Sequence, residues 1–433
     1  MDLAELARRT EKCLGGKACS RPDRIRGRFV SEGWTPDPAR AQPSRVGRRK
    51  SREARARRKR GRAVALLAGS VVVILILVLG FVFYKKVIDK PAIAADYAGP
   101  GGAVVVVEVA KGDTAREIAT AMADKDVVAS WEAFYEAAVA NPDMGSVMPG
   151  YYAMPSQIPA AEAVTKVVDP ATRVGALVIS EGRQLHDSRD VNTDAVKEGI
   201  YTKIAKASCI EDKCVTYDQL NEAGAASDLD SLGVPEWAQD SVRKVPDRDR
   251  QLEGLLAAGS LDFDPTGTPT QILSELVTDS VAAYTATGIL ESGSGNLSPY
   301  QLLVAASLVE RESKPEDFGK VARVILNRLK VNQPLQFDST VNYALDKTEV
   351  ATTDADREAV TPWNTYAMPG LPATPISSPS IAALQAMENP TEGNWLYFVT
   401  VDKEGTTVFT DSYEEHLRSI ERALESGILD SGR

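Results

Sequence analysis

The chain has 433 residues, of which 43% are hydrophobic, and a net charge of −10. This length exceeds a single small domain and predicts two or three units, and the apolar content supports a sizeable core. The charge is unevenly distributed. Residues 1–62 hold 20 basic and 7 acidic residues, which leaves 30 basic and 53 acidic residues in the rest of the chain. A basic head on an acidic body indicates that the two parts face different surroundings.

The head, residues 1–62, is rich in Arg, Pro and Ser and has little periodic apolar pattern, so we expect it to be mostly disordered. Its charge could serve nucleic acid, but Phe29 and Trp34 are its only aromatic residues. Attraction to anionic membrane lipid is the simpler explanation, so we predict lipid contact and no nucleic acid partner. Cys13 and Cys19 give only a weak zinc signal, and we expect free thiols.

A transmembrane helix is predicted over 63–84, where 22 residues carry no charge and suffice to cross a hydrocarbon core of roughly 30 Å. The run lies too far from the N-terminus for a signal peptide. Basic residues crowd its N-terminal side, so the positive-inside rule places residues 1–62 in the cytoplasm. We therefore expect a single-pass protein of the cell membrane with an extracytoplasmic C-terminal part, which begins with a stalk over 85–102.

The first folded unit is predicted over 103–182. A β-branched run from Ala103 to Val109 indicates a strand, and Thr114 can cap the helix that follows. The other expected elements of this unit are a helix over 131–140, a turn into a strand over 149–152, a segment over 164–168 and a strand over 175–179.

The middle region, 183–297, is predicted to consist of helices and polar loops, with helices over 247–258 and 270–285. Its function stays open. Cys209 and Cys214 would lie outside the cell, where a disulfide that closes a small loop is expected. Their spacing is not C-x-x-C, so a structural bond is favoured over a redox role.

The segment from Ser298 to Ser313 predicts a buried helix. Ser298 can cap it, Pro299 suits its first position, and Gln301 completes a capping box. Glu310 and Glu312 lie at its end, where apolar neighbours and the negative end of the helix dipole both raise a carboxyl pKa. Such a carboxyl group is a candidate general acid near neutral pH. The alternative is that both glutamates are solvated residues at the end of a core helix.

Helices over 316–329, 381–387 and 414–424 and strands over 395–401 and 406–410 are predicted to complete an α+β fold. Residues 361–376 are interrupted by Pro, Gly and Asn, and cannot form regular ladders. We expect them to be an ordered loop, which in enzymes commonly lines the site.

Several motifs follow one another in this part of the chain. LVAASLVERES, VARVILNRL, LQFDSTVNYAL, WNTYAMPGLPATPIS and WLYFVTV occur in order between about Leu302 and His416. The block resembles the YceG-like family of membrane-anchored endolytic murein transglycosylases. The likeness weakens over 103–182, where Gly112-Asp113-Thr114 and 149–152 look like the family's small LysM-like subdomain. The middle region departs from the family pattern, and the basic tail lies outside the shared core.

The resemblance implies cleavage of the β-1,4 bond between N-acetylmuramic acid and N-acetylglucosamine within nascent peptidoglycan strands. The product would be a 1,6-anhydromuramyl end, and the cleavage would terminate strand elongation. When the sugar's own 6-hydroxyl attacks, one glutamate can serve as acid and then as base, whereas ordinary glycosidases need two carboxylates. The resemblance thus implies an extracytoplasmic lytic transglycosylase with its catalytic domain over 298–428.

Glu310 and Glu312 lie 200° apart around the helix, so one of them faces the cleft. The resemblance favours Glu312 as the catalytic residue, with Glu310 as a structural partner. It also implies that five further residues hydrogen-bond the acetamido sugars or orient the acid, although each could instead satisfy loop backbone groups. These residues are Gln336, Asp338, Asn364, Thr365 and Tyr366.

No cofactor and no metal are predicted, because His186 and His416 are far apart and no phosphate-binding Gly-rich loop follows a strand. A rival reading is a non-catalytic glycan-binding adaptor whose tail recruits cell-wall synthases or division proteins. A third is a hydrolase of the same bond.

Overall fold

The computed structural model describes residues 73–81, 94–190, 193–345, 347–348 and 352–428. The chain divides into two compact units, Met1–Lys90 and Pro91–Arg433. In the first unit, residues 73–81 form a helix with exposed apolar side chains. None of the described helices combines the length and apolarity needed to cross a membrane. The rest of the predicted span, the tail with Cys13 and Cys19, and the start of the stalk lie outside the described residues.

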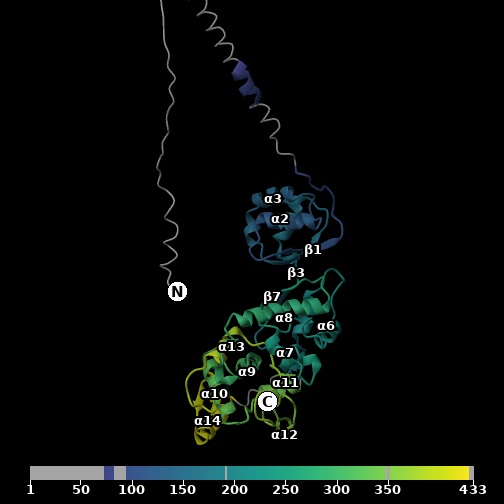
Figure 1. Ribbon diagram of the computed structural model, residues 1–433. Coiled ribbons are helices and arrows are strands. Elements are labelled where there is room, and N and C mark those ends of the chain that lie inside the picture. The colour runs from purple at the N-terminus through teal and green to yellow at the C-terminus, as the bar shows by residue number, and fades with distance from the viewer. Residues whose placement is uncertain (1–72, 82–93, 191–192, 346, 349–351, 429–433) are drawn as a thin grey trace, which may run out of the picture. The chain divides into compact units, whose positions relative to one another are not determined.

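The second unit is a mixed α+β structure whose first elements surround a small core of their own (Figure 1). Strand β1 (Val104–Val109) pairs antiparallel with β2 (Gly150–Pro155), and the short β3 (Arg173–Val174) pairs with β2. The helices are α2 (Ala115–Asp124), α3 (Trp131–Ala140) and α4 (Ala160–Val167), with 3₁₀ turns at Pro142–Ser146 and Pro170–Thr172.

Local sequence explains these elements. Thr114 forms a capping box with Glu117 at the start of α2, and Ser130 caps α3. The side chains of Val107, Met122 and Phe134 are fully enclosed between the strands and the helices. The predicted strand at 103–109 and the helices at 115–123 and 131–140 are confirmed.

The predicted strand at 175–179 is also confirmed as β4 (Ala176–Ile179), but its partner lies in the middle region. It pairs antiparallel with β7 (Gly259–Asp262), and Leu177 and Ile179 belong to a second, larger core. The division between the two cores therefore falls before β4 and does not coincide with the expected boundary at residue 182.

The middle region contains α5 (Ile200–Ala207), α6 (Tyr217–Gly224), α7 (Glu236–Val242) and the long α8 (Pro269–Thr285), which confirms the helix predicted over 270–285. The helix predicted over 247–258 is wrong. A 3₁₀ turn at Arg248–Arg250 is followed by buried turns. Gly254 has φ = 75°, and a Cβ there would lie 2.3 Å from the Pro375 side chain, so a helix cannot continue through it.

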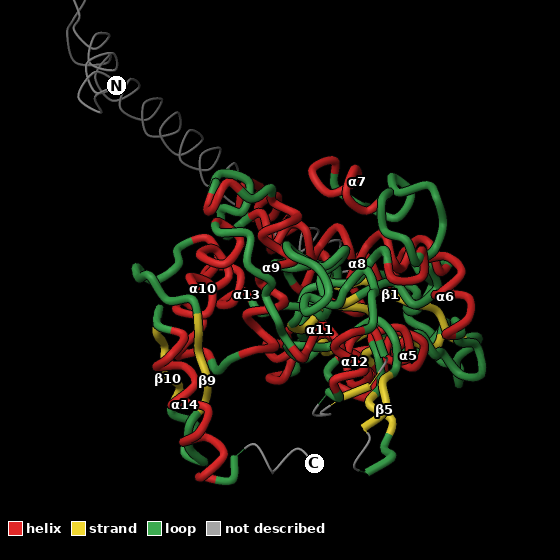
Figure 2. The backbone as a smooth tube through the Cα atoms, turned by 90° about the horizontal axis from the view of Figure 1, so that it is seen from below, coloured by secondary structure: helices red, strands yellow, loops and turns green. Residues whose placement is uncertain are grey.

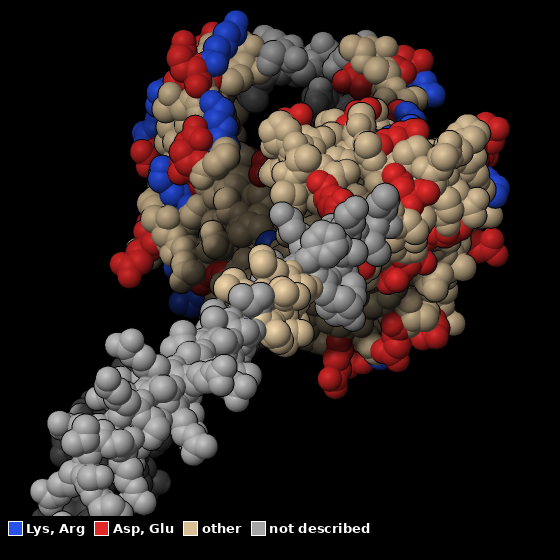
Figure 3. All heavy atoms as spheres, turned by 90° about the horizontal axis from the view of Figure 1, so that it is seen from above, with Lys and Arg blue, Asp and Glu red and all other residues tan. Residues whose placement is uncertain are grey.

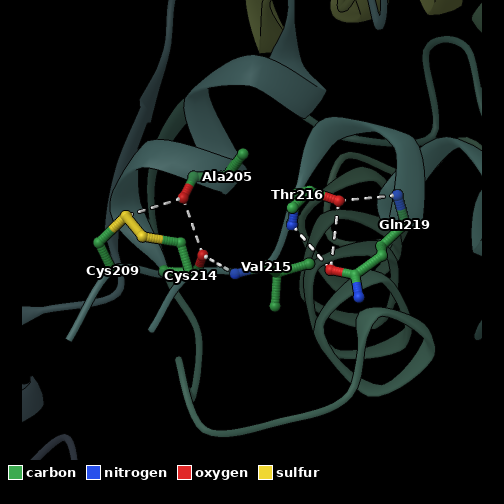
Figure 4. The surroundings of a disulfide bond; sticks show 7 residues. Ala205, Cys209, Cys214, Val215, Thr216 and Gln219 are labelled. Atoms are coloured by element: carbon green, nitrogen blue, oxygen red, sulfur yellow. Dashed lines mark hydrogen bonds between the residues drawn. A yellow bond between two sulfur atoms is a disulfide. The ribbon is translucent and has the colours of Figure 1, made fainter. Parts of the chain in front are cut away.

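Cys209 and Cys214 form a disulfide with an S–S length of 2.03 Å (Figure 4). Between them, Ile210 and Lys213 exchange backbone hydrogen bonds of 2.9 and 3.0 Å. The bond closes the hairpin that joins α5 to α6. Thr216 then starts α6 by a capping box with Gln219.

The larger core is centred on α9 (Pro299–Glu312), around which α7, α10 (Phe318–Lys330), α11 (Asp338–Ala344) and α13 (Ile381–Glu388) pack (Figure 1). The side chains of all residues from Leu302 to Val309 are buried. The helices predicted over 298–313, 316–329 and 381–387 are confirmed. The 3₁₀ turns in this part are at Ser294–Asn296 and Pro315–Asp317.

Two peripheral groups of elements flank this core. One is the antiparallel pair β9 (Tyr397–Thr400) and β10 (Thr407–Thr410), which carries α14 (Tyr413–Ser426) and confirms the predicted C-terminal elements. The other contains α12 (Asp354–Glu358) and a small sheet of β5 (Ser188–Asp190), β6 (Val196–Lys197) and β8 (Lys347–Thr348). Figure 2 shows β9, β10 and α14 together at one side of the protein, apart from α12 and β5.

Candidate active site

The candidate site lies at the C-terminal end of α9. The capping box forms as predicted, with the backbone N–H of Ser298 donating to Oε1 of Gln301 at 2.9 Å. The helix ends at Glu312, because Ser313 has extended dihedral angles. Because α9 is buried along most of its length and ends at Glu312, it places this carboxyl group at the edge of the core.

Glu312 is partly buried, and its pKa is raised to about 7, chiefly because burial penalises the charged form. The negative charge of Asp338 raises this pKa further, whereas the nearby hydroxyl and backbone N–H of Ser339 and the positive charge of Arg311 lower it. A carboxyl group with this pKa holds a proton in a large fraction of molecules at neutral pH, which is the property of a general acid.

Asp338 is the first residue of α11 and connects three segments of the site. Its Oδ1 accepts hydrogen bonds of 2.7 Å from the hydroxyl groups of both Thr352 and Tyr366. Its Oδ2 accepts one of 3.2 Å from the guanidinium of Arg357, on α12. Burial and the charge of Asp338 raise the pKa of Tyr366, so its hydroxyl stays protonated and serves as a donor. The carboxylate beside Glu312 is thus fixed in place.

Arg328 supplies a buried positive charge that interacts with the charge of Glu312. Its side chain is 5% exposed, and its Nε donates to the carbonyl oxygen of Leu396 at 2.6 Å. Burial lowers the pKa of the guanidinium, while the charge of Glu312 raises it. The guanidinium carbon lies 5.7 Å from the ring centroid of Tyr397, on β9. The charges of Asp338, on α11, and of Glu312, on α9, thus act close to an arginine that contacts β9.

The structure separates the two glutamates at the end of α9. Oε2 of Glu310 accepts hydrogen bonds from the backbone N–H of Ser380 at 3.0 Å and from its hydroxyl at 2.6 Å. Ser380 is the N-cap of α13, so Glu310 joins two helices of the core.

The remaining predicted residues fall into two groups. Asn364 and Thr365 are buried and bonded to the protein. Asn364 donates to the carbonyl oxygens of Asp356, Arg357 and Ala359, while Thr365 accepts from the backbone of Phe337 at 3.1 Å. They shape the loop around Asp338 and Tyr366. Gln336, in contrast, is exposed and has a left-handed backbone with φ = 53°, so its amide group faces solvent.

The sequence analysis missed Ser339, Thr352, Arg357 and Arg328. Arg328 and Ser339 lie inside the quoted motifs, and a charged residue on the buried side of a helix was a signal that could have found Arg328. Thr352 and Arg357 lie in a segment without a recognisable pattern, and only the fold brings them to Asp338.

A cavity lies away from this acid. Its volume is about 980 Å³, and it lies at the opposite end of α9, lined by residues that include Tyr300, Gln301, Arg323 and Lys330. Figure 3 shows acidic and basic side chains scattered over one face of the protein, with a hollow between two masses of it. Among the described residues, no three His, Cys, Asp or Glu side chains gather as metal ligands would.

The chain has recognisable relatives. An endolytic murein transglycosylase of Bacillus subtilis is 26% identical over 324 residues, which are 74% of this chain and 85% of the relative. An endolytic murein transglycosylase of Streptococcus pneumoniae is 31% identical over 185 residues, which are 41% of this chain and only 33% of that relative. A crystal structure of a putative YceG-like protein from Listeria monocytogenes matches 73% of this chain and 99% of its own, with 25% identity and a TM-score of 0.47.

The model of the YceG-like family matches residues 107–422. This range contains both cores, the two glutamates of α9 and the Asp338 cluster. The chain therefore belongs to the YceG-like family.

Proposed function

We propose that the protein is a peptidoglycan lytic transglycosylase in which Glu312 is the only acid and base of the reaction. One observation carries the proposal. Glu312 is buried enough to raise its pKa to about 7, yet part of the residue is still exposed to solvent. The names of its relatives from Bacillus subtilis and Streptococcus pneumoniae support the substrate and the reaction.

The reaction begins with the protonated Glu312. The carboxyl group donates its proton to the oxygen of the β-1,4 bond between N-acetylmuramic acid and N-acetylglucosamine. As the C1–O bond breaks, the 6-hydroxyl of the muramic acid attacks C1, and Glu312, now a carboxylate, takes the proton of that hydroxyl. The products are an N-acetylglucosamine end and a 1,6-anhydromuramyl end, no water is consumed, and the enzyme recovers its proton.

The surrounding residues hold the acid and the sugar. Arg328 stabilises the carboxylate that forms after the first proton transfer, and Asp338 favours its return to the neutral acid. Tyr366 is bound to Asp338 at 2.7 Å, and we assign it and the exposed Gln336 to contacts with the acetamido groups. Asn364 and Thr365 orient the loop, and Glu310 is structural.

Membrane attachment and domain roles belong to the same proposal. The uncharged residues 63–84 anchor the protein, residues 1–62 lie in the cytoplasm, and everything after Tyr84 lies outside. The part from β1 to β3 acts as the LysM-like unit, which is supported by the order strand, helix, helix, strand of β1, α2, α3 and β2. Residues 298–428 are the catalytic domain. Anchoring would hold the site near newly made glycan strands, where cleavage terminates their elongation. The partners proposed at this place are cell-wall synthases or division proteins.

Product analysis tests the proposal. The full chain in detergent is incubated with uncross-linked peptidoglycan strands, and the ends are analysed by mass spectrometry. We expect anhydro ends from the wild type and from Glu310→Gln, which has the same charge change two residues away, and about 10²- to 10⁴-fold fewer from Glu312→Gln. Ends heavier by one water would indicate a hydrolase. A wild-type chain that binds glycan and cleaves nothing would support the adaptor reading and refute the proposal.

A further inference from the structure

An aromatic cluster lies beside the acid, and the proposed reaction gives it no role. Tyr397 of β9, Tyr413 at the start of α14 and His416 one turn later pack together. The ring centroids of Tyr397 and His416 are 5.0 Å apart with the planes at 21°, so these two rings are stacked. The centroids of Tyr397 and Tyr413 are 5.6 Å apart at 51°. We call these three side chains the ledge.

The ledge is continuous with the acid through Arg328. The guanidinium carbon of Arg328 lies 5.7 Å from the ring centroid of Tyr397, and the same guanidinium interacts with the charge of Glu312. Tyr397 thus has Arg328 as one neighbour and His416 and Tyr413 as others. Tyr397 lies on β9, and Tyr413 and His416 lie on α14, so the ledge belongs to the group of elements formed by β9, β10 and α14 (Figure 2).

The chemical character of the ledge fits an uncharged ligand surface. The neighbouring Phe398 and Phe409 stack on each other, and they pack against the large core. Tyr397, one residue before Phe398, points to the other face of the strand. Burial and the positive charge of Arg328 lower the pKa of His416, so the imidazole is neutral at pH 7.

One ring of the ledge is left open to solvent. The side chain of Tyr413 is 60% exposed, whereas most large aromatic side chains of the described residues are buried or partly buried. A tyrosine ring offers an apolar face together with a polar hydroxyl edge. The CH groups on one face of a pyranose ring pack on such a face, and hydroxyl groups at the sugar's rim can bond to its edge.

We propose that the ledge is a saccharide subsite, where a pyranose ring of the glycan strand stacks on Tyr413 next to the sugars at the cleaved bond. The inference rests on the proposed function, since its occupant is the strand that Glu312 cleaves. Tyr397 and His416 hold the Tyr413 ring in place, and Tyr413 contacts the sugar. In a long glycan, one sugar can stack on Tyr413 while the bond to be cleaved lies at Glu312. A short glycan does not reach both positions, so the ledge favours long glycans over short ones.

Binding and kinetics of Tyr413 variants test the ledge. All variants are made in the full chain in detergent. Binding is measured in the Glu312→Gln background by titration with a tetrasaccharide of alternating N-acetylglucosamine and N-acetylmuramic acid. Kinetics on glycan strands are measured with the native Glu312. We expect Tyr413→Ala to raise Kd and KM by about 3- to 10-fold, the range of one aromatic stacking contact, and to change kcat less than 2-fold. Tyr413→Phe, which keeps the ring, should restore most of the affinity.

The matched control is Leu424→Ala, on the same helix. Leu424 is 51% exposed and lies three turns beyond Tyr413, so its loss should leave Kd and KM at the wild-type values. The ledge is overturned if Tyr413→Ala binds and turns over strands as the wild type does, or if Leu424→Ala weakens binding equally. Failure of the proposed function looks different. A wild type that forms no anhydro ends, but whose tetrasaccharide binding still depends on Tyr413, retains the ledge and loses the lytic reaction.

Discussion

Two glutamates of this protein, Glu253 and Glu312, have a pKa raised to about 7 chiefly by burial, but their surroundings differ. Glu253 is fully enclosed. Its Oε2 accepts hydrogen bonds from the backbone N–H of Leu185 at 3.2 Å and from the hydroxyl of Tyr343 at 3.1 Å. Glu312 is partly exposed at the end of a helix. A raised pKa therefore identifies a buried acid, and access to solvent decides whether that acid can transfer a proton to a substrate.

The enclosed glutamate supports the accessible one. Tyr343 belongs to α11, the helix that begins with Asp338. The guanidinium carbon of Arg250 lies 4.8 Å from the ring centroid of Tyr343 and 5.4 Å from that of Trp363. Trp363 lies in the same loop as Tyr366, three residues before it. Glu253 thus holds together the elements that place Asp338 and Tyr366 next to the site.

The largest expected effect separates the two glutamates by activity. Glu312→Gln removes the transferable proton, so we expect formation of anhydro ends to fall by about 10²- to 10⁴-fold, the usual contribution of a general acid or base. Glu253→Gln removes a proton that reaches no substrate and should retain most of the activity per folded molecule. Mass spectrometry of products at equal folded concentrations measures both. A comparable loss in both variants would contradict the distinction.

The second expected effect separates them by stability. The folded pKa of Glu253 lies above that of an unfolded glutamate, about 4.3. The folded state therefore binds more protons between about pH 4.5 and 7, and the free energy of unfolding falls as the pH rises through this window. The raised pKa corresponds to a loss on the order of 3 kcal/mol, complete above the folded pKa.

Glu253→Gln stays neutral at every pH, so its thermal midpoint should fall less between pH 5 and pH 8 than that of the wild type. Glu312 titrates in the same window, and the comparison with Glu312→Gln apportions the wild-type slope between the two residues. If the thermal midpoint of Glu253→Gln falls with pH as steeply as that of the wild type, the Glu253 carboxyl group of the wild type does not hold a proton in the folded core.

The sequence predicted the elements of the fold better than their partners. The capping boxes of α8 and α9 and the apolar period of α10 are local signals, and those helices form where expected. Buried turns have no such signal. The apolar residues around Gly254 match a helical period, yet the close approach of Pro375, more than a hundred residues away, requires a glycine with positive φ and prevents the helix.

The same limit applies to the site. Glu312 stands out in the sequence because a carboxylate follows a buried helix. Asp338 and Tyr366 came from the resemblance alone, and the structure joins them by a hydrogen bond. The role of Glu310 was not readable from sequence spacing, because its partner Ser380 lies 70 residues further on. Contacts between distant segments decide which polar residue is catalytic and which is structural.

A smaller effect is expected for Glu310, whose bonds to Ser380 are structural. Glu310→Ala leaves the backbone N–H and hydroxyl of Ser380 without their acceptor, which should cost about 1–2 kcal/mol of unfolding free energy. Activity per folded molecule should stay within a few-fold of the wild type. Denaturant unfolding and product analysis of the same sample measure the two quantities, and a loss of activity with full stability would assign Glu310 to the reaction.

The smallest expected effect concerns a difference between the two buried acids. At Glu253 the nearby charge, Arg250, lowers the carboxyl pKa, whereas at Glu312 the charge of Asp338 raises it and the hydroxyl of Ser339 lowers it. The proposed reaction requires the protonated form of Glu312, so the rate should fall as the pH rises through about 7. Asp338→Asn should move this alkaline limb to lower pH, and Ser339→Ala should move it to higher pH.

Loss of the Asp338 contacts also reduces the maximal rate, but a general loosening of the site would shift the pH profiles of both variants in one direction. Opposite shifts in kcat/KM against pH therefore report the charge of Asp338 and the hydroxyl of Ser339 acting on Glu312, and shifts of the same sign would contradict these two assignments.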